Sequence, residues 1–256
     1  MKDFSIIVPV RDGESIDKYN SAFFTNVKPL VEKGCTIVLV GEKSCLEKLS
    51  VVVKEYSDIK KSKLITVDSN GEYYVMLNDA VYHCPTKYFT VAHIEDTLAP
   101  FWFDVVKEHV SYYGLKYSAY LPVTENVDNG DKFVCFSNEI ALSTSFSDNL
   151  GEITLESLDT YFNYTLTGGV FRTEDFISCG RLKPSMGWGA LYEFLLRYVY
   201  NGFNIYVVPR VGYTRNLGVE GSFKDDVVYP LGGSEYDKMI EKCRSEYLFK
   251  NDRTEG

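Results

Sequence analysis

Hydrophobic and polar positions alternate in blocks through residues 1–100, and each block has the length of one strand or one helix. Four short, nearly continuous apolar runs predict buried strands at Phe4–Val10, Cys35–Val40, Leu64–Val67 and Tyr88–Ala92. Between these runs, apolar residues at helical spacing predict helices at Ile16–Lys33, Leu46–Tyr56 and Glu72–Tyr82. Strands that alternate with helices predict an α/β fold, because right-handed crossovers return each strand in the same direction.

The remaining chain is less regular. An amphipathic helix is predicted at Pro100–Gly114, and further helices at Leu191–Tyr200 and Gly233–Phe249. Strands are predicted at Tyr117–Val123, Lys132–Phe136, Leu166–Arg172 and Phe203–Val208, and Pro209 should end the last of them. The polar stretch Ser137–Asn163 is expected to be irregular, and a stretch of that length in a compact domain is usually a functional lid or binding loop. A protein-interaction role for this stretch is the alternative.

Ligands of parallel sheets bind at the carboxyl ends of the strands, so the loops that follow the predicted strands are the informative ones. These loops are Arg11–Ser15, Gly41–Ser44, Asp68–Gly71 and His93–Thr97. None of them contains the glycine pattern of a dinucleotide site, which argues against a classical NAD-binding protein.

Composition limits the size and the partners of the protein. The chain has 256 residues, 45% of them hydrophobic, which suits one sizeable core. We therefore expect one domain over residues 1–232, made of halves 1–100 and 101–232, and a helix with a tail over 233–256. The formal net charge of −9 argues against nucleic acid or an anionic membrane surface as a partner.

The six cysteines form no C-x-x-C pair, and no signal peptide is recognisable at the start of the sequence. Scattered cysteines in such a chain predict reduced thiols and a cytoplasmic location. No apolar run approaches the length of a membrane-spanning helix.

Three stretches share their order and spacing with one known family. They read F-S-I-I-V-P-V-R-D at Phe4–Asp12, Y-F-T-V-A-H-I-E-D-T-L-A-P at Tyr88–Pro100, and T-G-G-V-F-R-T-E-D-F-I at Thr167–Ile177, followed by G-W-G-A-L-Y-E-F-L-L-R at Gly187–Arg197. Together they resemble family 2 glycosyltransferases, in which such stretches form the nucleotide loop, the D-x-D metal motif, and the acceptor side with its base helix. The resemblance covers roughly residues 4–222.

This resemblance implies a GT-A-like fold, with a mostly parallel central sheet flanked by helices and a C-terminal helical appendage. It also implies metal-dependent, inverting transfer of a sugar from a UDP-, GDP- or dTDP-sugar to a carbohydrate acceptor, as in polysaccharide biosynthesis. The half at residues 1–100 would then bind the donor, and the half at 101–232 the acceptor.

The metal would be Mn²⁺ or Mg²⁺, because a carboxylate at a strand end can share such a cation with phosphate oxygens and waters. At the D-x-D place this chain has His93–Ile94–Glu95, followed by Asp96. Glu95 is the first candidate ligand and Asp96 the second, with a helix N-cap as the alternative role for Asp96. His93 is a candidate contact to the ribose or the metal, and a structural histidine is the alternative.

The loop after the first strand would line the nucleotide. Pro9 and Val10 would present backbone groups to the base, and Arg11 would stack on the base or reach a phosphate. Asp12 and Glu14 would bond the ribose, with a solvated turn as the alternative for Glu14. Glu42, after the second strand, lies where the family has an aspartate that contacts the base.

The family's catalytic Glu-Asp pair falls here on Ala190–Leu191, so Glu193 is the candidate general base. Its alternative role is an ion pair with Arg197 one helical turn away. The candidate acceptor-binding residues are Gly168, Gly169, Trp188 and Arg215. Small neighbours of Trp188 would give the acceptor room, and a core tryptophan is the alternative.

Two other functions stay open. The missing Glu-Asp pair allows a sugar-nucleotide-binding protein that has lost transfer activity. A sugar nucleotidyltransferase is disfavoured, because such enzymes begin with a glycine-rich loop and a basic residue, whereas this chain has R-D-G-E at Arg11–Glu14.

Overall fold

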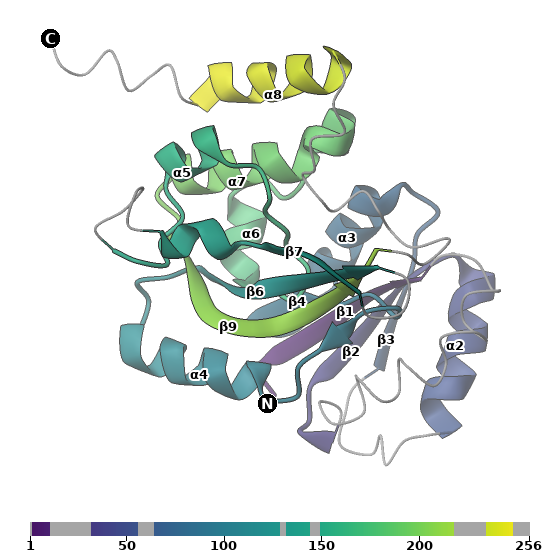
Figure 1. Cartoon of the computed structure of the whole chain (residues 1–256). Helices are drawn as coiled ribbons and strands as arrows, with labels where there is room; N and C mark the ends of the chain where they lie inside the picture. The colour runs from purple at the N-terminus through teal and green to yellow at the C-terminus, as the bar shows by residue number, and fades with distance from the viewer. Residues whose placement is uncertain are drawn as a thin grey trace, which may run out of the picture.

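A curled, mostly parallel β-sheet with helices on both faces forms the centre of the computed structural model (Figure 1). The structure describes residues 2–10, 32–55, 64–128, 132–143, 149–217 and 234–247. The strands run in the order β3-β2-β1-β4-β8-β6-β9-β5, and β7 pairs with β6 beside this path. This architecture is the one that the sequence predicted.

The first half of the sheet follows the predicted pattern closely. The parallel strands are β1 (Phe4–Val10), β2 (Thr36–Gly41), β3 (Leu64–Asp68) and β4 (Tyr88–Val91). The helices α2 (Lys43–Glu55) and α3 (Tyr73–Tyr82) connect them. The helix expected at Ile16–Lys33 lies almost wholly outside the described residues.

The second half of the sheet mixes strand directions. Its strands are β5 (Thr97–Leu98), β6 (Ala119–Asp128), β7 (Lys132–Ser137), β8 (Val170–Arg172) and β9 (Ile205–Asn216). Strand β8 runs antiparallel to both β4 and β6, whereas β9 runs parallel to β6. The carboxyl ends of β6 and β9 therefore lie at the same edge of the sheet as those of β1 and β4.

Three predicted strand boundaries are wrong by more than two residues. The strand predicted at Tyr117–Val123 continues to Asp128 as β6. Pro209 does not end its strand, because the register shifts from Pro122↔Val208 to Val123↔Val211 and the resulting bulge accommodates the proline. The strand expected from residue 166 begins only at Val170, because Gly168 takes a left-handed turn with φ of 74°. The two-residue strand β5, which pairs with β9, is too short to produce a sequence pattern.

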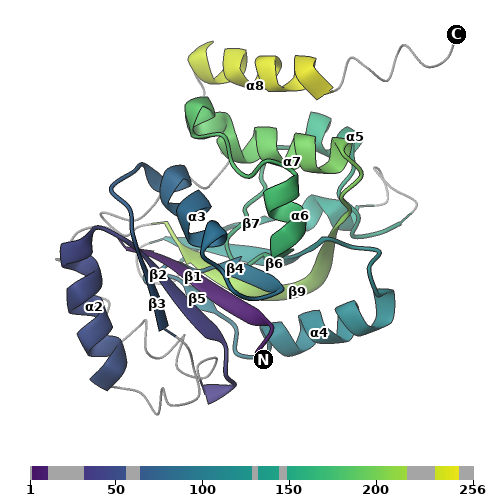
Figure 2. The same cartoon turned by 180° about the vertical axis from the view of Figure 1, so that it is seen from behind.

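Helices cover the two faces of the sheet and enclose two apolar cores. One core packs the sheet against α3, α5 (Leu155–Thr160), α6 (Thr173–Ser178) and α7 (Ala190–Tyr200). The other packs it against α2 and α4 (Trp102–Tyr113). Figure 2 shows α4 below the sheet and α6 and α7 above it, with α8 (Ser234–Tyr247) stacked on α7. The helix predicted near the C-terminus is thus confirmed.

The stretch Ser137–Asn163 is more ordered than predicted, although residues 144–148 lie outside the described part. It contains the 3₁₀ helix η2 (Glu139–Leu142) and α5, whose first turn is fixed by a reciprocal capping box between Thr154 and Ser157. Another 3₁₀ helix, η3 (Pro184–Gly189), precedes α7.

All six cysteines are free thiols, as expected. In the described part of the chain, no helix has both the length and the apolar character needed to cross a bilayer.

Candidate functional site

Strands β1 and β2 approach each other closely at the carboxyl edge of the sheet. A side chain at Gly41 is not tolerated there, because a Cβ atom would lie 2.3 Å from the carbonyl oxygen of Val10. The ladder between β1 and β4 ends at Ile7↔Val91, so Pro9 and Val10 extend beyond it. Both residues are buried, and their place at this edge is compatible with the predicted backbone contacts to a ligand.

Glu42 follows β2 at the same edge, and its side chain is exposed. Its carbonyl oxygen accepts hydrogen bonds from the backbone N–H groups of Cys45 and Leu46, which starts α2. The side chain is thus presented to solvent by the first turn of a helix. The other predicted donor contacts of this edge, Arg11, Asp12 and Glu14, lie outside the described residues.

The loop after β4 is held by a tyrosine from the far end of the chain. The hydroxyl of Tyr213 on β9 accepts a hydrogen bond from the backbone N–H of His93 (2.9 Å) and donates one to Oδ2 of Asp96 (2.8 Å). The other carboxylate oxygen of Asp96 accepts from the backbone N–H of Asn216 (2.9 Å). Asp96 is buried, and both of its oxygens are occupied by β9.

The imidazole of His93 is enclosed by protein groups on both nitrogens. Nε2 lies 2.9 Å from the hydroxyl of Tyr73, and Nδ1 lies 3.5 Å from Oδ2 of Asp96. The ring meets that of Tyr73 edge-on, with centroids 5.6 Å apart. This environment agrees with the alternative of a structural histidine, and the predicted ligand contact stays untested.

Glu95 lies between these two anchored residues and is partly exposed. Burial, with the added negative charge of Asp96 and Glu95, raises the pKa of Tyr213 well above its usual range, so its hydroxyl stays protonated and can donate.

The N-cap role considered for Asp96 is wrong, because α4 begins at Trp102 and β5 comes between them.

The described residues contain no group of three or more metal-ligating side chains. Glu95, however, is a partly exposed residue with one buried carboxylate oxygen, Oε1, and it precedes a second, anchored carboxylate in the loop. That donor set fits a Mn²⁺ or Mg²⁺ ion that takes most of its ligands from phosphates and waters. Glu95 and Asp96 as ligands stay predictions.

Gly168 and Gly169 pack closely against residues near the loop at residues 93–96. The carbonyl oxygen of Gly168 accepts a hydrogen bond from Nε1 of Trp102 (2.7 Å), and a Cβ at Gly168 would lie 2.7 Å from Cβ of Tyr213. A Cβ at Gly169 would lie 2.5 Å from the side chain of Leu121. Both glycines are therefore required by packing, whether or not an acceptor also contacts them.

The other predicted acceptor residues lie in two places. Arg215 is buried on β9, paired with Asn126 and next to Asn216, at the edge where β9 holds Asp96. Trp188 is in η3, whose last residue, Gly189, lies under helix α8, because a Cβ there would meet the sulfur of Met239 at 2.6 Å. Space at Gly189 is thus filled by the protein, whereas Gly187 opens onto free space.

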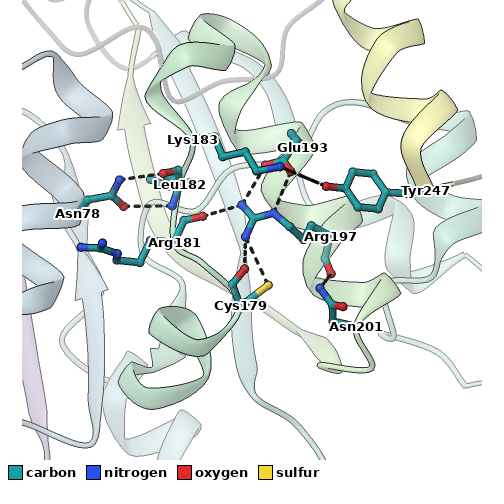
Figure 3. A network of polar contacts seen from close by, with 9 residues as sticks. All are labelled: Asn78, Cys179, Arg181, Leu182, Lys183, Glu193, Arg197, Asn201 and Tyr247. Carbon is teal, nitrogen blue, oxygen red and sulfur yellow. Dashed lines mark hydrogen bonds and ion pairs between the residues drawn. The ribbon is translucent and has the colours of Figure 1, made fainter.

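Glu193, the predicted base, is fully buried in a network of polar contacts (Figure 3). Arg197 binds both of its oxygens, at 2.8 Å and 2.9 Å. Lys183 lies 2.7 Å from Oε1, and the hydroxyl of Tyr247 on α8 donates to the same atom (2.6 Å). The ion pair with Arg197, considered as the alternative role, is therefore present.

The network also determines the charge of Glu193. Burial alone would raise the pKa of its carboxyl group, but the hydrogen bonds from Arg197, Lys183 and Tyr247 outweigh burial and lower it. Arg197 in turn donates to the carbonyl oxygens of Cys179 and Arg181. An ionised carboxylate with this many donors is a weak proton acceptor, and its catalytic role stays untested.

Tyr73, Tyr213 and Tyr247 hold the predicted residues in place, and no sequence pattern marks them as functional. Tyr213 lies two residues before the predicted acceptor residue Arg215, but the last strand is predicted to end at Pro209, before both of them. Tyr247 belongs to the apolar stripe of the predicted C-terminal helix, and only its hydroxyl contact was unforeseen.

The fold has known structural counterparts. S. aureus TarS 1–349 in complex with UDP-GlcNAc matches 97% of this chain and 68% of its own length, with a TM-score of 0.65 and 16% sequence identity. The complex of the same piece with UDP gives a TM-score of 0.63 at 16% identity, over 97% and 67% of the two chains. A crystal structure of a longer S. aureus TarS chain matches 99% of this chain with a TM-score of 0.61 and 15% identity.

The present chain spans 44% of that longer TarS chain. No protein-family model and no curated protein matches the sequence. At this low identity the likeness establishes the fold alone. The chain has a GT-A-like fold, as its motifs implied.

Proposed function

We propose that this chain is a glycosyltransferase that binds a nucleotide sugar at the carboxyl edge of β1, β2 and β4 and transfers the sugar to a carbohydrate acceptor. UDP-sugars are the first donors to test, since TarS has been crystallised with UDP and UDP-GlcNAc on the same fold. GDP- and dTDP-sugars are the other candidates. A glycan or polysaccharide acceptor and an inverting outcome belong to the same proposal.

The loop at residues 93–96 is the observation that supports this proposal most. It lies at the carboxyl end of β4, where open α/β sheets bind their ligands. It presents Glu95 beside His93 and Asp96, and β9 anchors both of these neighbours. So many buried polar groups at one strand end are costly to assemble, which favours a functional reason for them.

A divalent cation, Mn²⁺ or Mg²⁺, belongs to the proposal, with Glu95 as its first protein ligand and Asp96 as the second. When bound, the ion would neutralise negative charge on the diphosphate. The chain's own part is to hold Glu95 toward the ligand and to keep Asp96 fixed. Pro9, Val10 and Glu42 would surround the base, and Arg11, Asp12 and Glu14 would complete the donor site.

A binding protein without transfer activity is the second candidate, and it rests on α7. The positions of the family's catalytic pair, Ala190 and Leu191, are apolar and buried. Glu193 is the nearest carboxylate on the helix, and Arg197, Lys183 and Tyr247 saturate it. Either Glu193 gives up one of these donors when an acceptor binds, or this chain has no base on α7.

Thermal unfolding with a panel of UDP-, GDP- and dTDP-sugars, with and without Mn²⁺, tests donor binding. A ligand at one hundred times its dissociation constant stabilises by about 2.7 kcal/mol. At roughly 2–4 °C per kcal/mol for a chain near this size, the expected shift is several degrees. A shift for one nucleotide only with metal supports the donor site and identifies its base. No shift with any of them contradicts the proposal.

The variants Glu193→Gln and Arg197→Gln separate the two candidates. Each breaks the same buried ion pair, which costs roughly 3–5 kcal/mol of stability. If Glu193 is the base, Glu193→Gln abolishes transfer per folded molecule, while Arg197→Gln retains a measurable part of it. If Glu193 is only structural, transfer follows the folded fraction in both variants. Wild type that binds donor but never transfers supports the binding protein.

A further inference from the structure

Tyr213 joins two segments that are distant in the sequence. Its hydroxyl bonds the backbone of His93 and the carboxylate of Asp96, the two residues that flank Ile94 and Glu95. It therefore bridges the beginning and the end of the loop with one oxygen atom. The backbone N–H of Asn216, three residues further along β9, adds a second bond to Asp96.

The ring of Tyr213 is tightly enclosed, so its hydroxyl has little freedom. On one side the backbone of Gly168 packs against the ring, and a Cβ on that residue would lie 2.8 Å from the ring atoms Cγ and Cδ2. Next to it in the chain, Gly212 lies against the indole of Trp102, where a Cβ would meet the ring at 2.6 Å. The indole N–H donates to the carbonyl oxygen of Gly168, which locks the cluster.

We propose that Tyr213 is a positioning residue of the donor site, whose hydroxyl fixes how the loop at residues 93–96 presents its carboxylates to a metal-bound nucleotide. The inference rests on the proposed function, because it assumes that the diphosphate and its cation bind at this loop. It assigns Asp96 mainly to anchoring the loop and leaves Glu95 as the residue directed toward the ligand.

The physical reason lies in the cost of a buried carboxylate. Asp96 is about as buried as Tyr213, and each of its oxygens has a hydrogen-bond donor from β9. Loss of the hydroxyl would leave Oδ2 without that donor in a poorly solvated place, so the carboxylate would turn away from β9 toward solvent. The loop would then lose its defined shape, and Glu95 with it.

Tyr213→Phe removes the hydroxyl and keeps the ring. Tyr120→Phe is the matched control, because Tyr120 is equally buried in the same apolar core and its hydroxyl has no hydrogen-bond partner among the described residues. Isothermal calorimetry measures the affinity for UDP with and without Mn²⁺, and urea unfolding measures the stability of each ligand-free variant.

We expect Tyr213→Phe to weaken UDP binding in Mn²⁺ by roughly 10–100-fold, as is usual when a group behind a metal ligand is removed. Binding of UDP without metal should change little, and Tyr120→Phe should behave as wild type. A variant that loses stability but keeps its Mn²⁺-dependent affinity would show that Tyr213 is merely structural and would overturn the inference. Wild type that does not bind UDP under either condition would overturn the inference together with a UDP donor.

If Tyr213→Phe does not fold, Asp96→Asn disrupts the same anchor with less change in volume, because the amide nitrogen cannot accept the hydrogen bond that Tyr213 or Asn216 donates to one of the two carboxylate oxygens. It should cause a similar loss of Mn²⁺-dependent affinity, and undiminished affinity would overturn the inference. Where both variants fold, the double variant should be no weaker than the worse single one, because the two residues act through one contact. Additive losses would contradict an action of Tyr213 through Asp96.

Discussion

At the position of Gly168, any other residue type would destabilise the fold. Its φ of 74° lies in the left-handed region, and a Cβ there would overlap the ring of Tyr213. The same residue accepts the indole hydrogen bond of Trp102. A single glycine thus lets the turn before β8, the ring of β9 and the first residue of α4 meet below the candidate donor loop.

Gly168→Ala should therefore destabilise the protein by more than the cost of a left-handed alanine, which is of order 1–3 kcal/mol. Gly202→Ala is the control, because Gly202 has a similar φ of 82° but has no atom within 4 Å of the place of a Cβ. Urea unfolding of both variants measures the difference. Equal losses would mean that the ring of Tyr213 yields without cost.

At the residue scale, the charged groups of the candidate site are easier to predict from sequence than the side chains that bind them. His93, Glu95 and Asp96 stand out because polar residues end a buried apolar strand. Their partners, Tyr73 and Tyr213, lie 20 and 120 residues from His93 and have no unusual pattern of their own. Such contacts arise only when the sheet forms, so no local signal could have predicted them.

At the scale of elements, the strands that pack on both faces were the most predictable. The bounds of β1 agree with the prediction, those of β3 and β4 differ by one residue at the carboxyl end, and β2 is shifted by one residue. Continuous burial requires continuous apolar sequence, which makes such strands recognisable. Strand β9 was predicted to end too early, because its bulges at Pro209 and Gly212 break the alternation. As a result, Tyr213, which lies beyond the first bulge, was not predicted to be part of the sheet.

Helix α8 shows how an element predicted from its apolar stripe can have a second role. Ile240, Cys243 and Tyr247 are buried against the core, as the stripe predicted. Arg244 also lies over the ring of Phe162 at 4.7 Å, and Tyr247 bonds Glu193. The helix is therefore held against residues 101–232 by polar contacts as well as by burial.

For the molecule as a whole, the fold class was predictable from sequence, but the pairing of the carboxylates in residues 101–232 was not. The chain carries a net charge of −9, and two of its carboxylates form ion pairs with lysines: Glu193 with Lys183 and Glu152 with Lys116. Burial would raise the pKa of Glu152, but the hydrogen bonds from Lys116 and Tyr117 outweigh it and lower the pKa. Carboxylates of this kind make the stability of the entire chain depend on pH.

The buried carboxylate of Glu193 should make a specific contribution to acid unfolding. Because its pKa is lower in the folded chain than the ordinary value of 4.5, its stabilisation is complete above about that pH and is lost as the pH falls through the folded value. Urea unfolding of wild type and Glu193→Gln from about pH 7 to about pH 3 measures it. The stability gap between the two proteins should be constant near neutrality and narrow in acid, because glutamine does not titrate. A gap that stays constant to the lowest pH would mean that the network around Arg197 does not hold Glu193 ionised in the folded chain.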